Sequence, residues 1–113
     1  MDGSPGAFYF KEASHEASKD KWVIALQGGG ECTTNAECTQ RSATILGSSK
    51  NYNLTKLLTQ FGSSDAEENP AMHGWNHVRV MYCTGDLHLG QMNATDKPEW
   101  GWARFAGARI VDA

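Results

Sequence analysis

The chain has 113 residues, of which 40% are hydrophobic and 20% are charged, and its formal net charge is −3. This length and composition suit one small globular domain or a piece of a larger one. Lysines and arginines are scattered along the chain, which argues against a nucleic-acid-binding protein. No stretch approaches the roughly 18 consecutive apolar residues typical of a membrane-spanning helix. The sequence therefore predicts neither a nucleic-acid partner nor a membrane partner.

Two features point to an oxidising, extracellular environment. Cys32 and Cys38 are two of three cysteines, and two Asn-x-Thr sequons begin at Asn53 and Asn93, which are the glycosylation candidates. Disulfides and N-glycans are both typical of secreted proteins. Met1 is followed by Asp-Gly-Ser-Pro, without the basic and apolar regions of a signal peptide. We therefore expect a secreted protein whose signal peptide is not present in this sequence.

The first predicted elements are two strands. Aromatic side chains in residues 7–11 favour a short strand, and the polar residues 12–21 are expected to form a hairpin-like loop. Residues 22–26 form a continuous apolar run, the pattern of a strand covered on both faces in α/β proteins. This run is followed by three glycines at positions 28–30.

A helix is expected directly after the glycines. Thr34 and Glu37 have the spacing of a capping box, in which each residue satisfies a backbone N–H of the other. We expect this helix to continue to about Leu46. Residues 53–61 form a second, weaker helical pattern whose leucines share one face: Leu54, Leu57 and Leu58.

The second half of the chain predicts a strand and a helix. Residues 62–74 are polar and rich in turn residues, and an alternating strand follows from Val78 to Tyr82. A final helix is expected over residues 99–113, with Asp96 as its N-cap. The order strand, glycine turn, helix, strand, helix indicates an α/β fold.

The glycine triplet is the candidate functional element. A phosphate-binding loop would end in Gly-Lys-Ser/Thr, and a dinucleotide fingerprint would need glycine at the position of Thr33. The remaining functional interpretation is an oxyanion hole, because a glycine turn between a buried strand and a helix presents backbone N–H donors. A purely structural turn explains the same pattern.

Seven short motifs stand in the order typical of one family. They are Asp2-Gly3-Ser4-Pro5, Leu26-Gln27-Gly28-Gly29-Gly30-Glu31-Cys32, Cys38 with Arg41, Gly47-Ser48-Ser49-Lys50, Glu67-Glu68-Asn69-Pro70, Trp75-Asn76 and Tyr82-Cys83-Thr84-Gly85-Asp86. From Asp2 to about Ile110 the chain resembles the pectin acetylesterase family, whose animal branch is Notum. The resemblance implies a serine carboxylesterase with an α/β-hydrolase fold and no cofactor.

The resemblance also implies roles for individual residues. Gly29 and Gly30 would supply oxyanion-hole N–H groups. Cys32 and Cys38 would form a disulfide, although their spacing alone leaves two free thiols open. Cys83 is expected to be a free thiol, because Met1 stands where family members usually have its cysteine partner.

The nucleophile that the resemblance implies is missing. Family members carry it in Gly-x-Ser-Ala-Gly, and no Gly-x-Ser-x-Gly occurs in these 113 residues. The aspartate and histidine of the triad come later still in the family. We therefore expect the N-terminal part, about the first third, of a single α/β-hydrolase-like domain, inactive by itself.

Other polar residues are interpreted as structural. Ser48 and Ser49 are read as cap or turn residues, and Asp86 as the cap of a turn that Gly85 permits. His73 and His77 are four residues apart, but Pro70 and Gly74 nearby disfavour a helix, so no metal site is predicted.

The expected function is the removal of acetyl groups from cell-wall polysaccharide such as acetylated pectin by the full-length protein. Glu31 departs from the large aromatic residue that the family places beside the glycines, and its charge would repel a polyanionic pectin. Two alternatives stay open. One is a Notum-like carboxylesterase that acts on a lipidated protein, and the other is a non-enzymatic remnant that binds a glycan or a partner.

Overall fold

A computed structural model describes residues 1–92 and 98–113, which form two compact units. The sheet unit comprises Phe8–Gln27 and Asn53–Met81. The glycine-turn unit comprises Met1–Ala7, Gly28–Tyr52 and Tyr82–Ala113. The sequon at Asn93 and the expected N-cap Asp96 lie outside the described residues.

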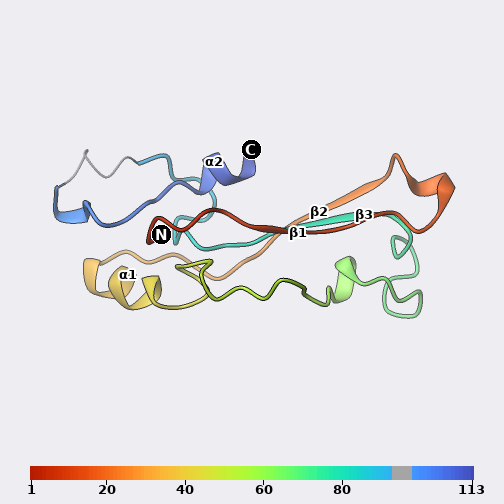
Figure 1. Ribbon diagram of the computed structural model, residues 1–113, viewed down its shortest axis with the longest axis horizontal. Coiled ribbons are helices and arrows are strands. Elements are labelled where there is room, and N and C mark those ends of the chain that lie inside the picture. Colours follow the sequence, from red (N-terminus) through yellow and green to blue (C-terminus); the bar gives the residue numbers. More distant parts are fainter. Residues whose placement is uncertain (93–97) are drawn as a thin grey trace. The chain divides into compact units, whose positions relative to one another are not determined.

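The sheet unit holds a mixed sheet of three strands in the order β1-β3-β2 (Figure 1). The strands are β1 (Phe8–Lys11), β2 (Trp22–Leu26) and β3 (Asn76–Val80). β3 pairs antiparallel with β1 and parallel with β2. The first two strands are confirmed, but residues 12–21 are not hairpin-like. They contain the 3₁₀ turn η1 (Glu16–Ser18) and join two strands that β3 separates.

One face of this sheet is apolar and exposed. Paired residues on neighbouring strands point to the same face, and the register aligns Phe8 and Leu26 with Val80, and Phe10 and Ile24 with Val78. The apolar sheet face is made of five side chains that are 49–67% exposed: Phe8, Phe10, Trp22, Ile24 and Leu26. We expected β2 to be covered on both faces. This expectation is wrong, because none of the described residues buries the apolar sheet face.

The opposite face is covered by the segment around η2 (Gln60–Gly62), which contacts β2 and β3. The expected helix over residues 53–61 does not form, and Leu54 and Leu57 are 100% and 84% exposed. An amphipathic helix depends on packing of its apolar face, which these leucines lack. Instead, the Tyr9 hydroxyl donates to the Asn53 carbonyl over 2.6 Å, and Gln60 adopts a φ of +56°.

The third strand lies two residues earlier than expected, because it begins at Asn76 and ends at Val80, which leaves Tyr82 outside the sheet. Strict alternation is also absent, since Asn76 and His77 are both buried. The Asn76 amide donates to the carbonyls of Lys19 and Lys21 over 2.8 and 3.1 Å. A buried polar side chain at the start of β3 thus holds the loop that leads into β2.

The glycine-turn unit contains the helix α1 (Asn35–Ser42), whose Thr34–Glu37 capping box is confirmed. The helix ends at Ser42 rather than near Leu46. The Thr44 hydroxyl donates to the Arg41 carbonyl, a side-chain bond that competes with helix continuation. Gly47 then lies against the end of the helix, where a Cβ would be 2.3 Å from the Arg41 carbonyl oxygen.

The C-terminal segment forms two short elements instead of one helix over residues 99–113. They are the 3₁₀ turn η3 (Pro98–Trp100) and the helix α2 (Gly107–Val111). Tertiary contacts separate them, because the Phe105 carbonyl accepts from the Met92 N–H and the Gly107 N–H donates to Asp86. None of the described helices is both long and apolar enough to cross a bilayer.

Candidate active site

The glycine turn, residues 28–30, is held by Arg41 of α1. The Nη2 of Arg41 donates to the carbonyl oxygens of Gly29 and Gly30 over 2.7 and 2.8 Å, and its Nε donates to the Leu46 carbonyl over 3.2 Å. The guanidinium also lies 5.4 Å from the centre of the Tyr82 ring, within the range of a cation–π contact. One side chain therefore ties the turn to the end of α1.

Arg41 determines which side of the turn presents N–H groups. In a trans peptide the C=O and N–H point in opposite directions, and the described residues contain no cis peptide bond. The Gly29 carbonyl shares its peptide with the N–H of Gly30, and the Gly30 carbonyl shares its peptide with the N–H of Glu31. Because both carbonyls face the guanidinium, the N–H groups of Gly30 and Glu31 point away from it.

These N–H groups, and that of Gly29, have no acceptor in the part of the chain that the structure describes. Within residues 1–92 and 98–113, no hydrogen bond is formed by the N–H of Gly29, Gly30 or Glu31. Unpaired backbone donors directed away from a positively charged anchor can receive an anionic oxygen. The arrangement is therefore chemically suited to an oxyanion hole.

The geometry disfavours a side chain at two of the three glycines. Gly30 has a φ of +69°, a conformation that L side chains rarely adopt. At Gly29 a Cβ would lie 2.8 Å from Leu46 Cδ2 and 3.2 Å from Tyr82 Cδ1. At Gly28 a Cβ would meet no atom within 4 Å, so this position provides a matched control for the other two.

A disulfide joins Cys32, the second residue after the turn, to Cys38 of α1, as the resemblance implied. The Cys32 N–H also donates to the Gly85 carbonyl over 3.2 Å. Cys83 is buried and is the free cysteine. The segment that follows the glycines is thus fixed at both of its ends, by Arg41 and by the disulfide.

A cavity of about 330 Å³ lies beside the turn. Its wall combines apolar side chains with the exposed carboxylate of Glu31. The apolar part consists of Leu87, Trp100 and Phe105. Glu31 also lines a second cavity of about 590 Å³ together with Arg41. The sequence indicated the importance of Glu31 but gave no signal for this apolar wall, which depends on the fold of the C-terminal segment.

Asp86 caps the turn, as expected, and it also binds a segment distant in sequence. Its Oδ1 accepts from the Thr84 hydroxyl and from the His88 N–H, and its Oδ2 accepts from the Gly107 N–H over 2.8 Å. A Cβ at Gly90 or Gly107 would come within 2.3 Å of a carboxylate oxygen of Asp86. Gly90 and Gly107 are the sequence features that could have indicated close packing against Asp86, and the sequence analysis did not identify them.

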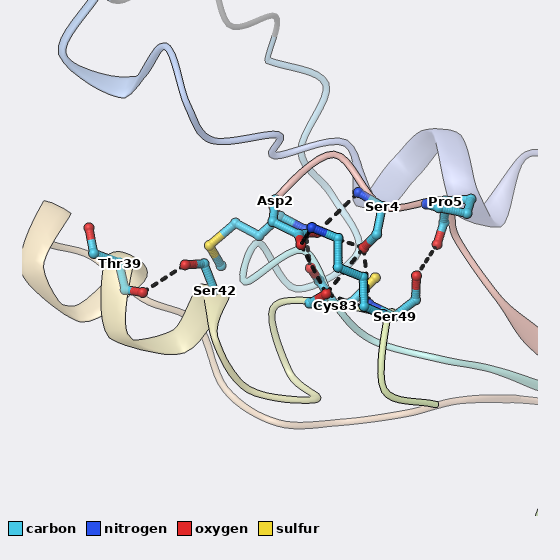
Figure 2. A network of polar contacts seen from close by, with 10 residues as sticks. Asp2, Ser4, Pro5, Thr39, Ser42, Ser49 and Cys83 are labelled. Atoms are coloured by element: carbon cyan, nitrogen blue, oxygen red, sulfur yellow. Dashed lines mark hydrogen bonds and ion pairs between the residues drawn. The ribbon is translucent and has the colours of Figure 1, made fainter. Parts of the chain in front are cut away.

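Ser48 and Ser49 are turn residues, as interpreted from the sequence (Figure 2). The Ser48 hydroxyl donates to Asp2 Oδ2 over 3.0 Å, and the Ser49 hydroxyl donates to the Pro5 carbonyl over 2.7 Å. The Lys50 ammonium lies 2.8 Å from Asp2 Oδ2 and, with hydrogen bonds from Ser4 and Ser48, holds the pKa of Asp2 well below its usual value. A carboxylate so stabilised is a poor base for activating a serine.

His73 and His77, the pair considered as metal ligands, each have a hydrogen-bond partner on the backbone. His73 Nδ1 lies 3.2 Å from the Asn69 carbonyl oxygen, and His77 Nε2 lies 2.7 Å from the Met72 carbonyl oxygen. Across the part of the chain that the structure describes, no three His, Cys, Asp or Glu side chains gather as metal ligands would. Asn53, the described sequon residue, is exposed.

The chain is similar to known esterases over its whole length. A family model described as Pectinacetylesterase matches residues 1–113. Pectin acetylesterase 11 of Arabidopsis thaliana is 34% identical over 110 residues, which cover 97% of this chain and 27% of that protein. Palmitoleoyl-protein carboxylesterase NOTUM of Mus musculus is 35% identical over 112 residues, which cover 97% of this chain and 21% of that protein. The chain thus spans only about a quarter of the length of these relatives.

A solved structure agrees with these sequence similarities. The structure of the Wnt deacylase Notum from Drosophila matches with a TM-score of 0.83 at 31% identity, over 98% of this chain and 32% of that chain. This match bears out the α/β-hydrolase-like fold class, of which the chain contains a part. With the family model matched from the first residue to the last, the chain belongs to the pectinacetylesterase family.

Proposed function

We propose that this chain supplies the oxyanion-hole segment of a serine carboxylesterase. The observation that supports the proposal is the glycine turn, in which Arg41 binds two carbonyls and the N–H groups of Gly29 and Gly30 have no acceptor among the described residues. The relatives are named as carboxylesterases, which is consistent with such a site. In the whole protein the nucleophilic serine would come from sequence outside these 113 residues.

In the proposed mechanism the serine oxygen attacks the ester carbonyl, and its proton passes to the triad histidine. The carbonyl oxygen becomes an oxyanion and accepts hydrogen bonds from the N–H groups of Gly29 and Gly30. Collapse of this intermediate expels the alcohol with the histidine proton and leaves an acyl-enzyme. Water then releases the acid and regenerates the serine.

The substrate that we propose is an acetylated polysaccharide, because the relatives include a protein named as a pectin acetylesterase. The disulfide and the exposed Asn53 are consistent with an extracellular location for such an enzyme. A second candidate is the fatty acyl ester of a lipidated protein. The apolar wall of Leu87, Trp100 and Phe105 beside the turn favours this candidate, since it could contact an acyl chain.

The two candidates are distinguished by product analysis on the whole protein. Purified enzyme is incubated separately with acetylated pectin and with a palmitoleoylated serine peptide, and released acetate and fatty acid are quantified. Acetate release with no fatty acid supports the first candidate, and the reverse supports the second. Absence of both products would overturn the proposed esterase function.

A substitution of Glu31 tests whether the substrate is an anionic polysaccharide. A carboxylate at the cavity mouth repels an anionic sugar chain, so Glu31→Gln should lower the KM for acetylated polygalacturonate and leave the KM for a neutral acetyl ester unchanged. An equal effect on both substrates would show that Glu31 does not face the sugar chain.

A further inference from the structure

The sequon Asn53-Leu54-Thr55 lies on the surface of the sheet unit. All three residues are exposed and belong to no helix or strand, and Leu54 is 100% exposed. Among the described residues, the side chains of Asn53 and Thr55 form no hydrogen bond. An N-linked oligosaccharide is attached to the side-chain amide of the asparagine in such a sequon. The structure therefore leaves the acceptor amide of Asn53 accessible.

The sequon is held beside the strand β1. The hydroxyl of Tyr9, a residue of β1, donates a hydrogen bond to the backbone carbonyl of Asn53 over 2.6 Å. This bond uses the main chain of Asn53 and leaves its side chain available. A cavity of about 370 Å³ is lined by all four residues of β1 and by residues 54–58, which follow Asn53 directly. A group attached to Asn53 is therefore next to both β1 and this cavity.

The edge of the sheet at β1 is open in the part of the chain that the structure describes. The strand order β1-β3-β2 makes β1 an edge strand, which pairs with β3 on one side only. The cavity along β1 also presents apolar side chains, since Leu54 and Leu57 are 100% and 84% exposed. An edge strand beside exposed apolar side chains is a template for pairing with a second copy of the chain, and native proteins commonly cover such edges.

We propose that Asn53 carries an N-linked glycan and that this glycan covers the open edge of β1. The sugars are bulky and solubilising, so they keep a second copy of the chain away from Leu54, Leu57 and the edge. The inference rests on the extracellular location proposed above, because N-glycans are added in the secretory pathway. It does not depend on the esterase chemistry, since the sequon belongs to the sheet unit and the glycine turn to the other unit.

The first test detects the modification directly. The whole protein is expressed behind a secretion signal in cultured mammalian cells, treated with peptide N-glycosidase F in water labelled with heavy oxygen, and digested with trypsin. Trypsin cleaves after Lys50 and Lys56, so Asn53 lies in a short peptide that does not contain the sequon at Asn93. Most copies of this peptide should carry a labelled aspartate in place of the asparagine. An unlabelled peptide from the secreted protein would overturn the site, and this mass measurement does not depend on esterase activity.

The second test measures what the glycan covers. Asn53→Gln and Thr55→Ala each abolish the sequon, and each should strengthen self-association in sedimentation equilibrium by about tenfold or more, the effect of burying one exposed leucine. Thr55→Ser keeps the sequon and should behave like the unaltered protein. The matched control is Asn51→Gln, which changes an exposed asparagine that does not belong to a sequon. It should leave self-association unchanged.

Enzymatic removal of the glycan from the folded, unaltered protein makes the same comparison without a sequence change before folding. Treatment with peptide N-glycosidase F should strengthen self-association to the level of the Asn53→Gln protein. If Asn53 is glycosylated but neither the substitution nor the enzyme changes self-association, the glycan does not cover the edge of β1 and its proposed role is wrong.

Discussion

At the residue scale, Arg41 determines the conformation of the glycine turn. Its guanidinium donates to the Gly29 and Gly30 carbonyls in solvent-exposed hydrogen bonds and to the Leu46 carbonyl in a partly buried one. Hydrogen bonds to charged groups contribute about 1.5–3 kcal/mol, and exposure to solvent reduces this contribution. Because Arg41 is half-buried, we expect Arg41→Met to lower the free energy of unfolding by about 1–2 kcal/mol. Urea denaturation followed by circular dichroism measures this change.

A matched control for that variant is Lys56→Met, which removes a charge from an exposed position in the sheet unit. Exposed substitutions usually change stability by less than about 0.5 kcal/mol. If Arg41→Met and Lys56→Met had the same small effect, Arg41 would not be holding the turn.

The lowered pKa of Asp2 implies that the stability of the folded chain depends on pH. Lys50 and the neighbouring hydroxyls lower the pKa of Asp2 in the folded state below its ordinary value of 3.8. A lowered folded-state pKa contributes stability that is fully present above the unfolded-state pKa and is lost as the pH falls through it toward the folded-state pKa. The urea concentration at the unfolding midpoint should therefore decrease when the pH is lowered below about 4. In Asp2→Asn this decrease should be smaller. Identical pH profiles for the two proteins would refute this role.

At the scale of elements, the sequence was sufficient where the signals are local. The run of residues 22–26 and the Thr34–Glu37 capping box each depend on neighbouring residues, and both appear as expected. The helices expected over residues 53–61 and 99–113 do not form, because contacts between distant segments override a weak periodicity. The bond between Asp86 and the Gly107 N–H is one such contact, and it joins residues 21 apart in sequence.

The docking of α2 on Asp86 gives a second stability prediction. At Gly107 a Cβ would lie 2.3 Å from Asp86 Oδ1 and 2.6 Å from the Cα of His88, so backbone atoms must move. Gly107→Ala should destabilise the chain by about 1–3 kcal/mol, the usual cost of overpacking. Gly28→Ala, where a Cβ meets nothing within 4 Å, should be close to neutral. A neutral Gly107→Ala in the same urea titration would mean that α2 does not dock this way.

The candidate site was predicted only in part. The positions of the glycines, the cysteines and Glu31 were available from the sequence, and the disulfide is confirmed. The link from Arg41 to the turn and the wall of Trp100 and Phe105 were not, because they require the fold of segments far apart in the chain. The roles of Gly29 and Gly30 in catalysis remain a prediction.

At the scale of the whole molecule, the apolar sheet face governs the behaviour of the isolated chain. Five large side chains on β1 and β2 are 49–67% exposed there, and an exposed apolar patch beside open strand edges favours association. The 113-residue chain is expected to self-associate at micromolar concentration. Ile24→Lys, which places a charge on this face in the middle of the edge strand β2, should increase the monomer fraction in sedimentation velocity. A monodisperse monomer before the substitution would contradict the prediction.

The proposed role of the glycine turn is to stabilise an oxyanion, and the measurement that tests this role is kcat of the whole protein on an acetyl ester. Gly30→Ala places a Cβ at a φ of +69°, a conformation that L side chains rarely adopt, so we expect the backbone to relax and to displace the N–H. Gly28→Ala adds a methyl group in open space. We predict that kcat falls by about a hundredfold or more in Gly30→Ala, the usual effect of losing one oxyanion donor. The Gly28→Ala enzyme should stay within about twofold of the original. Equal kcat values for the two folded variants would show that the Gly30 N–H does not stabilise the oxyanion.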